Sequence, residues 1–171
     1  MVPVHGLSPP SEWVQRYSGL ILPGGSVLDV ACGAGRHMKW LSELGMTCLG
    51  IDRSEEALDH ARAYGEVICA DIENGPWPLP NRLFDAVVVT HYLWRPLLPT
   101  LVSALGAGGL FIYETFAQGQ ETVGKPSRPE FLLRPGELLE LARDHHLTVV
   151  AFEDVWLDHP RRRIQRLVAK H

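Results

Sequence analysis

The sequence has few cysteines, no excess of positive charge and no long apolar run. Three cysteines, Cys32, Cys48 and Cys69, are scattered over 171 residues, and none lies in a CxxC pair or in the spacing of a zinc module. No stretch reaches the roughly 18 apolar residues of a membrane helix, and the start lacks the features of a signal peptide. We therefore exclude disulfide scaffolds, metal modules and membrane proteins, and expect one cytoplasmic domain over residues 1–171.

Acidic residues outnumber basic ones, and the basic ones are unevenly placed. Sixteen Lys and Arg against twenty Asp and Glu give a net charge of −4, which disfavours non-specific binding to nucleic acid or membranes. Five basic residues are nevertheless concentrated near the C-terminus: Arg161, Arg162, Arg163, Arg166 and Lys170. A solvated turn is the simpler interpretation of this cluster, and an RNA contact is the alternative.

Short apolar runs alternate with helical patterns along most of the chain. The runs that read as strands are residues 26–30, 47–51, 66–70, 84–89, 108–113, 148–156 and 163–169. Five β-α units followed by a hairpin predict an α/β fold, with a doubly wound, mostly parallel seven-stranded sheet and an antiparallel C-terminal hairpin. In such sheets ligands bind beyond the carboxyl ends of the strands.

Two segments lie outside the main run of predicted strands and helices. Residues 1–25 are expected to form a helical cap, in which Ser11 follows two prolines and has the chemistry of a helix N-cap. Residues 114–134 form a polar loop that is long for a compact domain. Loops of this length are often lids or recognition segments, so we expect a lid or substrate loop there.

The turn after the first predicted strand has the composition of a ligand-binding loop. Cys32-Gly33-Ala34-Gly35 precedes a helix, and glycines at such a turn let backbone N–H groups approach a ligand. A dinucleotide-binding loop would have a third glycine at position 38, which is Met38 here. The carboxylate of Asp29 would repel a pyrophosphate and suits a ligand that carries an ammonium and a sulfonium. A nicotinamide oxidoreductase is therefore disfavoured.

Four motifs, in order, resemble those of class I S-adenosylmethionine (SAM) dependent methyltransferases. They are Val27–Gly35, Gly50-Ile51-Asp52, Cys69-Ala70-Asp71-Ile72 and the stretch from Phe84 to Tyr92. One departure is Ala31, where many members have glycine. The small size and the Tyr113-Glu114-Thr115-Phe116 stretch are similar to the bacterial tellurite-resistance-like branch, whose members are linked to methylation of small acceptors such as chalcogen oxyanions.

This resemblance implies a Rossmann-like methyltransferase fold and SAM as cofactor, with S-adenosyl-L-homocysteine (SAH) as product. It implies that Asp52 binds both ribose hydroxyls and that Asp71 meets the adenine amino group. The predicted cofactor-binding set is Asp29, Ala31, Cys32, Gly33, Gly35, Asp52, Arg53, Asp71, Ile72 and Thr90.

Methyl transfer from a sulfonium is an in-line displacement, in which the protein mainly aligns the nucleophile and excludes water. A base is needed only when the nucleophile is protonated, and a histidine with a pKa of about 6.5 suits that task. His91, Tyr92 and Glu114 are the predicted catalytic residues; for His91, contact with the cofactor or the backbone is the alternative. Arg95, Tyr113 and Arg128 are the predicted substrate-binding residues.

The sequence thus predicts methyl transfer to a small-molecule acceptor by a monomer or homodimer, without a metal. The stretch Thr90–Leu93 lacks the Asn/Asp-Pro-Pro-Tyr/Phe motif of nucleobase amino-methyltransferases, so DNA adenine methylation is disfavoured. The remaining alternatives are an RNA or protein methyltransferase, suggested by the basic C-terminal cluster, and a non-catalytic SAM-binding partner subunit.

Overall fold

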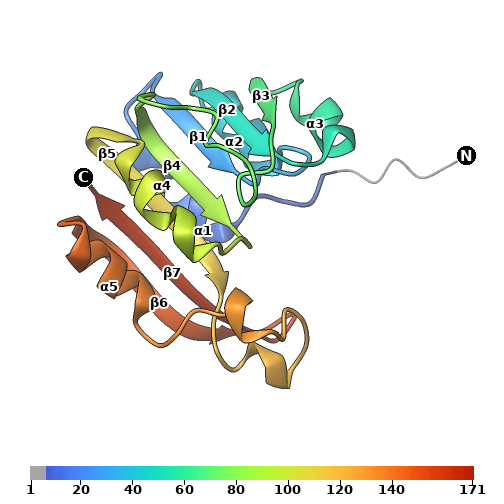
Figure 1. Ribbon diagram of the computed structural model, residues 1–171, viewed down its shortest axis with the longest axis vertical. Coiled ribbons are helices and arrows are strands. Elements are labelled where there is room, and N and C mark those ends of the chain that lie inside the picture. The colour runs from blue at the N-terminus through green and yellow to red at the C-terminus, as the bar shows by residue number, and fades with distance from the viewer. Residues whose placement is uncertain (1–6) are drawn as a thin grey trace, which may run out of the picture.

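The computed structural model describes residues 7–171, so the first six residues of the predicted cap segment lie outside the described part. Seven strands form one sheet in the order β3-β2-β1-β4-β5-β7-β6 (Figure 1). The strands are β1 (Ser26–Val30), β2 (Thr47–Asp52), β3 (Glu66–Cys69), β4 (Phe84–Thr90), β5 (Leu105–Phe116), β6 (Thr148–Leu157) and β7 (Arg162–Lys170). The first five are parallel to one another, whereas β7 is antiparallel to both β5 and β6. The predicted fold class is confirmed.

Helices cover both faces of the sheet. They are α1 (Glu12–Tyr17), α2 (Arg36–Glu43), α3 (Glu55–Ala61), α4 (Leu98–Ser103) and α5 (Glu137–Asp144), with short 3-10 turns η1 (Ser18–Leu20), η2 (Arg95–Leu97), η3 (Gln120–Thr122) and η4 (Pro129–Phe131). Strand residues alternate between two apolar clusters, because side chains of a strand point to opposite faces. Val27 packs with α1, α2 and α3, whereas Leu28 packs with α4 and α5.

The start of α1 confirms the predicted N-cap. The Ser11 hydroxyl accepts hydrogen bonds from the backbone N–H groups of Trp13 and Val14, at 3.1 and 3.4 Å. These bonds satisfy donors that have no partner within the helix. Trp13 is fully buried, and its indole N–H donates to the Leu167 carbonyl at 3.2 Å. The cap segment is therefore anchored on β7.

The structure differs from the predicted elements in two places. β5 is longer at both ends than the expected 108–113, because it pairs with β4 from Leu105, opposite Phe84, and with β7 as far as Phe116, opposite Ile164. The predicted loop 114–134 consequently begins inside the sheet. In addition, residues 70–83 connect β3 to β4 without a helix, so the expectation of five β-α units is wrong for this connection.

Two further properties concern the whole described chain. Within residues 7–171, no helix is both long and apolar enough to cross a membrane. Over the same residues, no group of three or more His, Cys, Asp or Glu side chains is arranged to hold a metal ion.

Candidate active site

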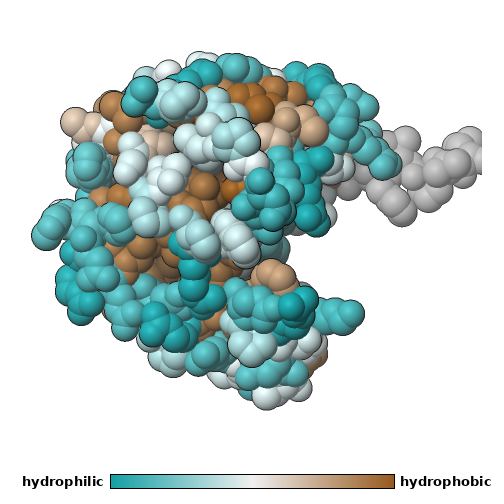
Figure 2. All heavy atoms as spheres, in the orientation of Figure 1, coloured by the Kyte–Doolittle hydropathy of each residue, from teal (hydrophilic) through white to brown (hydrophobic). Residues whose placement is uncertain are grey.

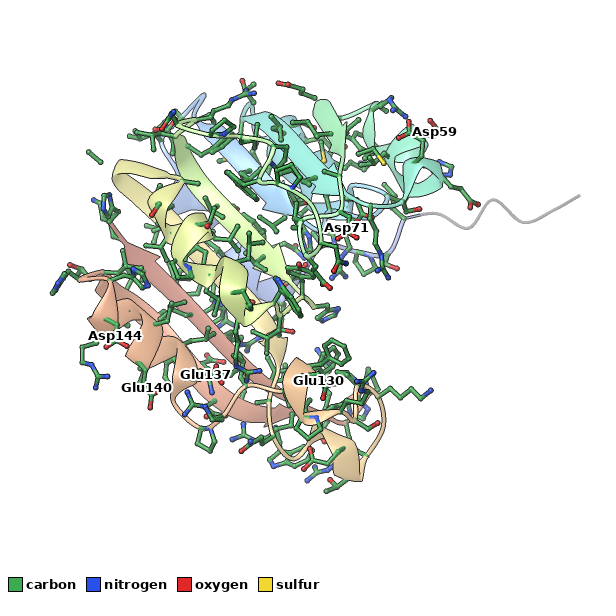
Figure 3. The ribbon with its side chains drawn as sticks, in the orientation of Figure 1. Asp59, Asp71, Glu130, Glu137, Glu140 and Asp144 are labelled. Atoms are coloured by element: carbon green, nitrogen blue, oxygen red, sulfur yellow. The ribbon has the colours of Figure 1, made fainter. Side chains whose placement is uncertain are left out.

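The molecular surface is notched where the parallel strands end (Figure 2). Asp71, which follows β3, and Glu130, in η4, lie on opposite sides of this notch (Figure 3). The carboxyl ends of β1, β2 and β4 meet at the same edge of the sheet. This is the edge at which open α/β sheets bind their ligands.

The first cavity at this edge, which we call the acidic cavity, has a volume of about 250 Å³. It is lined by Ala31, Ile51, Asp52, Arg53, Ala70, Asp71, Ile72, Glu73, Tyr92 and Phe131. Asp52 accepts a hydrogen bond from the backbone N–H of Gly33 at 2.8 Å and another from that of Ser54 at 2.9 Å. The carboxylate thus joins the glycine loop to the start of α3 while it borders the cavity.

Asp71 lies on the exposed rim of the acidic cavity. Its Oδ1 accepts hydrogen bonds from the backbone N–H groups of Glu73 and Asn74, and its Oδ2 accepts one from the Asn74 amide, all at 3.0–3.1 Å. These bonds, led by that of the Asn74 side chain, lower the pKa of Asp71. An ionised carboxylate in a fixed orientation therefore stands at the mouth of this cavity.

The second cavity, which we call the glycine-loop cavity, is more open, with a volume of about 720 Å³. It is lined by Leu7, Ser8, Ala31, Cys32, Gly33, Ala34, Arg36, His37, His60, Thr90 and His91. Ala31 borders both cavities, which therefore adjoin. Its φ of 54° is left-handed, a conformation that costs a residue with a Cβ about 1–2 kcal/mol. At Gly33, with the same φ, an added Cβ would meet only open space.

Asp29 lies in β1 and does not line either cavity. Its carboxylate is buried, and neither oxygen has a hydrogen-bond partner in the described chain. Burial raises its pKa to about 7, while Arg36 opposes and Asp52 adds to this rise. A buried carboxylate without a partner is costly, and a ligand ammonium, directly or through water, would satisfy it. With acidic groups at the ends of β2 and β3, the residues present fit SAM.

Gly35 and Cys32, both in the predicted cofactor set, differ in whether they border a cavity. Gly35 does not line either cavity; an added Cβ there would lie 2.9 Å from Cβ of Ala61, so this glycine lets α2 begin close against α3. Cys32 lines the glycine-loop cavity, but burial raises the pKa of its thiol. A nucleophilic thiolate at Cys32 is therefore disfavoured.

His91 lies where three cavities meet. It borders the glycine-loop cavity, an apolar pocket of about 280 Å³ and a basic cleft of about 510 Å³. Its φ is 51°, its backbone N–H donates to the Glu114 carbonyl at 2.9 Å, and its ring stacks on Phe116 with centroids 4.9 Å apart. Desolvation in the cleft lowers the pKa of His91, with the charges of Arg36 and Arg162 adding to the effect. The imidazole is therefore neutral at pH 7.

The residues on either side of His91 also face the cavities. Thr90 borders the glycine-loop cavity, and its hydroxyl lies 3.5 Å from Nδ1 of His37. His37 accepts a hydrogen bond from the Ser11 backbone N–H at 3.0 Å, and burial lowers its pKa to about 3. Tyr92 borders the acidic cavity and the apolar pocket, and burial raises the pKa of its phenol. Tyr92 therefore presents a neutral hydroxyl between these two cavities.

Glu114, predicted as catalytic, is engaged inside the protein. It lines the basic cleft, but one carboxylate oxygen accepts a hydrogen bond from the Ser11 hydroxyl at 2.9 Å. The other oxygen pairs with Arg166 at 3.1 Å. Both side chains of this ion pair are less than 10% exposed. Both oxygens of Glu114 thus have partners within the protein, and they link β5 to the cap segment and to β7.

The three predicted substrate-binding residues do not line any of these cavities. Arg95 pairs with Glu137 at 2.6 Å and donates to two backbone carbonyls of the 114–134 segment. Tyr113 is fully buried, and its hydroxyl donates to the Tyr92 carbonyl at 2.6 Å. Arg128 is exposed and pairs with Glu130. Arg95 and Tyr113 are thus engaged within the fold and Arg128 faces solvent, so the cavities described above give no support to their predicted role.

Sequence reasoning also missed residues that border the site. They are Leu7 and Ser8 of the cap segment, Phe116 at the end of β5, and Lys125 and Phe131 of the long loop. Phe131 carried a usable signal, since it is an aromatic residue in a loop of mainly polar residues, and in the structure it is 39% exposed. The others carried none, because only the tertiary structure brings them to His91.

Comparison with known proteins identifies the family. Residues 27–109 match the family described as "Methyltransferase domain". A probable S-adenosylmethionine-dependent methyltransferase from Mycolicibacterium smegmatis is 28% identical over 158 residues, which cover 81% of this chain and 60% of that protein. The chain belongs to the class I SAM-dependent methyltransferases. SAM is the methyl donor of this family.

Two further proteins are similar to this methyltransferase. A tRNA U34 carboxymethyltransferase from Vibrio vulnificus is 33% identical over 175 residues, covering 89% of this chain and 54% of that protein. The crystal structure of TehB from Haemophilus influenzae superposes with a TM-score of 0.79 at 19% identity, over 97% of this chain and 64% of that one. The chain spans 26% to 60% of the length of the curated relatives it matches.

Proposed function

We propose that this protein is an enzyme that transfers the methyl group of SAM to a small-molecule acceptor. The observation that carries the proposal is the position of His91, a neutral imidazole between the glycine-loop cavity and two further cavities. When bound, SAM supplies a methyl group on a sulfonium, which is a good leaving group. The protein then has to hold SAM, align the acceptor and remove any proton from it.

Residues of the two adjoining cavities hold different parts of SAM. Asp52 offers its carboxylate to the two ribose hydroxyls, and Asp71 offers its own to the adenine amino group. Ile72 provides apolar contact for the base, since it lines the same cavity. Asp29, in the strand that leads into the glycine loop, favours a cation nearby, since its buried carboxylate has no partner in the described chain.

His91 acts on the acceptor. A heteroatom of the acceptor forms a bond to the methyl carbon, and the carbon–sulfur bond breaks with its electron pair left on sulfur. When that heteroatom carries a proton, the neutral imidazole of His91 takes it. Tyr92 borders both the acidic cavity and the apolar pocket, so its ring separates SAM from solvent on the acceptor side.

Calorimetric titration with SAM, SAH and NAD tests the cofactor assignment. We expect micromolar binding of SAM and SAH and none of NAD. Asp52→Ala should weaken SAM binding by more than tenfold, whereas Asp144→Ala, on the exposed side of α5 and far from the notch (Figure 3), should leave it unchanged. Equal affinities of the Asp52→Ala variant and the parent protein would refute the role of Asp52.

NMR titration of the His91 side chain tests the proposed base. Because desolvation and nearby arginines lower its pKa, the imidazolium should form only below pH 6.5, and the base should remain available into mildly acidic solution. With a methyl acceptor found by screening, His91→Gln should lower kcat by roughly 10²–10⁴-fold and keep the affinity for SAM. A His91 that titrates above pH 6.5 contradicts this assignment.

An RNA acceptor is the second candidate, favoured by the likeness to the tRNA carboxymethyltransferase. The structure leaves fewer basic side chains to contact RNA, since Arg163 pairs with Asp154 and Arg166 is buried against Glu114. Filter binding of bulk tRNA decides between the two. Binding that weakens steeply from 50 to 200 mM salt and is lost in Arg161→Gln/Arg162→Gln would favour RNA; no binding at low salt would exclude it.

A further inference from the structure

We propose that the acceptor is an organic acid, whose acidic group binds in the basic cleft and whose apolar body fills the apolar pocket beside it. This inference rests on the proposed function and names the substrate class of the same site.

The basic cleft has an excess of positive charge. Its cationic side chains are Arg36, Lys125, Arg161, Arg162 and Arg166, and its acidic ones are Glu12 and Glu114. The buried ion pair between Arg166 and Glu114 satisfies both of its members. The other cations then face a single carboxylate, that of Glu12. A protein with a net charge of −4 thus concentrates positive charge beside His91, which favours an anionic ligand there.

Two arginines of the cleft keep most of their donors free. Arg36 donates one N–H to the Pro9 carbonyl at 3.1 Å, and Arg162 donates one to the Pro160 carbonyl at 3.0 Å. Neither pairs with a carboxylate among residues 7–171. Arg161 differs, since it pairs with Asp158 and lies over the Trp156 ring.

Arg36 and Arg162 are also the arginines that act on the imidazole of His91. Arg36 borders the glycine-loop cavity as well as the cleft, so it is shared with the cofactor side. Of these cavities, Arg162 and Lys125 border only the basic cleft. A guanidinium fork matches a carboxylate with two parallel hydrogen bonds. Arg162 is therefore the chief candidate to hold the acidic group.

The apolar pocket favours an acceptor whose remaining part is apolar. Its apolar walls are Leu93, Phe116, Pro126 and Phe131, and the polar side chains Glu73 and Thr115 also border it. The carboxylate of Glu73 disfavours an acidic group in this pocket, which leaves the basic cleft for that group. Phe116 and His91 border both this pocket and the basic cleft, with their rings stacked. A molecule that spans the two spaces therefore passes next to His91. An inorganic oxyanion would occupy the cleft and leave these aromatic side chains uncovered, so an organic acid fits the whole surface better.

The experiment compares three probes on SAH-saturated protein: benzoate, its neutral counterpart benzamide, and sulfate. Binding is measured by two-dimensional ¹H–¹⁵N NMR, which also places each probe on the chain. We expect benzoate to bind at least tenfold tighter than benzamide or sulfate, and to shift the signals of residues 91, 116, 131 and 162. Arg162→Gln should weaken benzoate at least fivefold and leave SAH affinity within twofold.

Two further variants separate the parts of the proposal. Phe131→Ala should weaken benzoate and leave sulfate unchanged, while Arg143→Gln, an exposed arginine of α5, should change neither. Equal binding of benzoate and benzamide, equal binding of benzoate and sulfate, or no benzoate binding while SAH binds normally would each overturn the inference. If the unmodified protein did not bind SAH, the proposed function would instead be refuted.

Discussion

At the scale of single residues, the site holds groups that are unfavourable for the fold and useful for a ligand. The Asp29 carboxylate is buried without a partner in the described chain, and Ala31 and His91 have left-handed φ angles although neither is glycine. Such features persist where the surrounding structure fixes them, and they concentrate at functional sites. Asp29 gives the clearest consequence, because its ionisation is coupled to stability.

We expect Asp29→Asn to stabilise the ligand-free protein in a pH-dependent manner. The folded protein holds a proton on Asp29 up to a pKa of about 7, whereas the unfolded chain releases it near 3.8. The free energy of unfolding of the parent protein therefore falls, relative to Asp29→Asn, as pH rises between these values. The variant should match the parent at pH 4 and exceed it by up to about 4 kcal/mol at pH 8.

Urea denaturation at both pH values measures this difference, with Asp144→Asn as the exposed control. The same Asp29→Asn substitution should weaken SAM binding at pH 8, because it removes the charge that attracts the ligand ammonium. A stability difference that is the same at pH 4 and pH 8 would contradict the linkage.

At the scale of elements, the predicted lid is attached at several points. The Ala117 backbone N–H donates to the Arg163 carbonyl, and the Gln118 N–H donates to that of Leu133. From the other side, Arg95 in η2 holds the segment through Glu137 and the carbonyls of Glu130 and Leu132. Arg95 thus fixes the wall that carries Phe131, so its effect on the acceptor is indirect.

Arg95→Met should loosen this wall. It leaves Glu137, only 8% exposed, with the more distant Arg134 as its remaining ionic partner, and it leaves two carbonyls without their donor. Because Arg95 itself is partly exposed, we expect a loss of about 1–3 kcal/mol, together with faster proteolysis between residues 120 and 135. Arg143→Met is the matched control. An unchanged urea midpoint and an unchanged cleavage rate would show that the wall does not depend on Arg95.

At the scale of the whole molecule, a buried polar chain joins segments that are far apart in sequence. Ser11 at the start of α1 donates to Glu114 in β5, and Glu114 pairs with Arg166 in β7. Arg166 in turn pairs with Glu153 in β6. Through His37, the same Ser11 also contacts α2. The cap segment that borders the glycine-loop cavity is therefore tied to the antiparallel part of the sheet.

Glu114→Gln should destabilise the fold by about 2–4 kcal/mol, because it leaves the buried Arg166 charge with Glu153 alone. Glu43→Gln, which breaks an exposed pair within α2, should cost less than about 0.5 kcal/mol. Urea denaturation measures both. If Glu114 were instead catalytic, the variant would lose methyl transfer and keep its urea midpoint.

The sequence by itself determined the sheet and predicted which strand ends border the cavities proposed to hold SAM. Strand periodicity located all seven strands, and the residues expected to bind SAM follow strands whose carboxyl ends a parallel sheet brings to one edge. Asp52, Asp71 and Gly33 accordingly border two adjoining cavities. This part was predictable because its residues depend on local turns and on one topology rule.

Only the tertiary structure decided the acceptor side. Arg95, Tyr113 and Glu114 have the side chains of substrate-binding or catalytic residues, but each has a buried or backbone partner from a distant segment. The basic C-terminal residues likewise divide into paired and available ones, with Arg163 engaged and Arg162 free beside His91. Which charges meet a substrate depends on which partners the fold brings within hydrogen-bond distance, and sequence spacing does not encode those pairings.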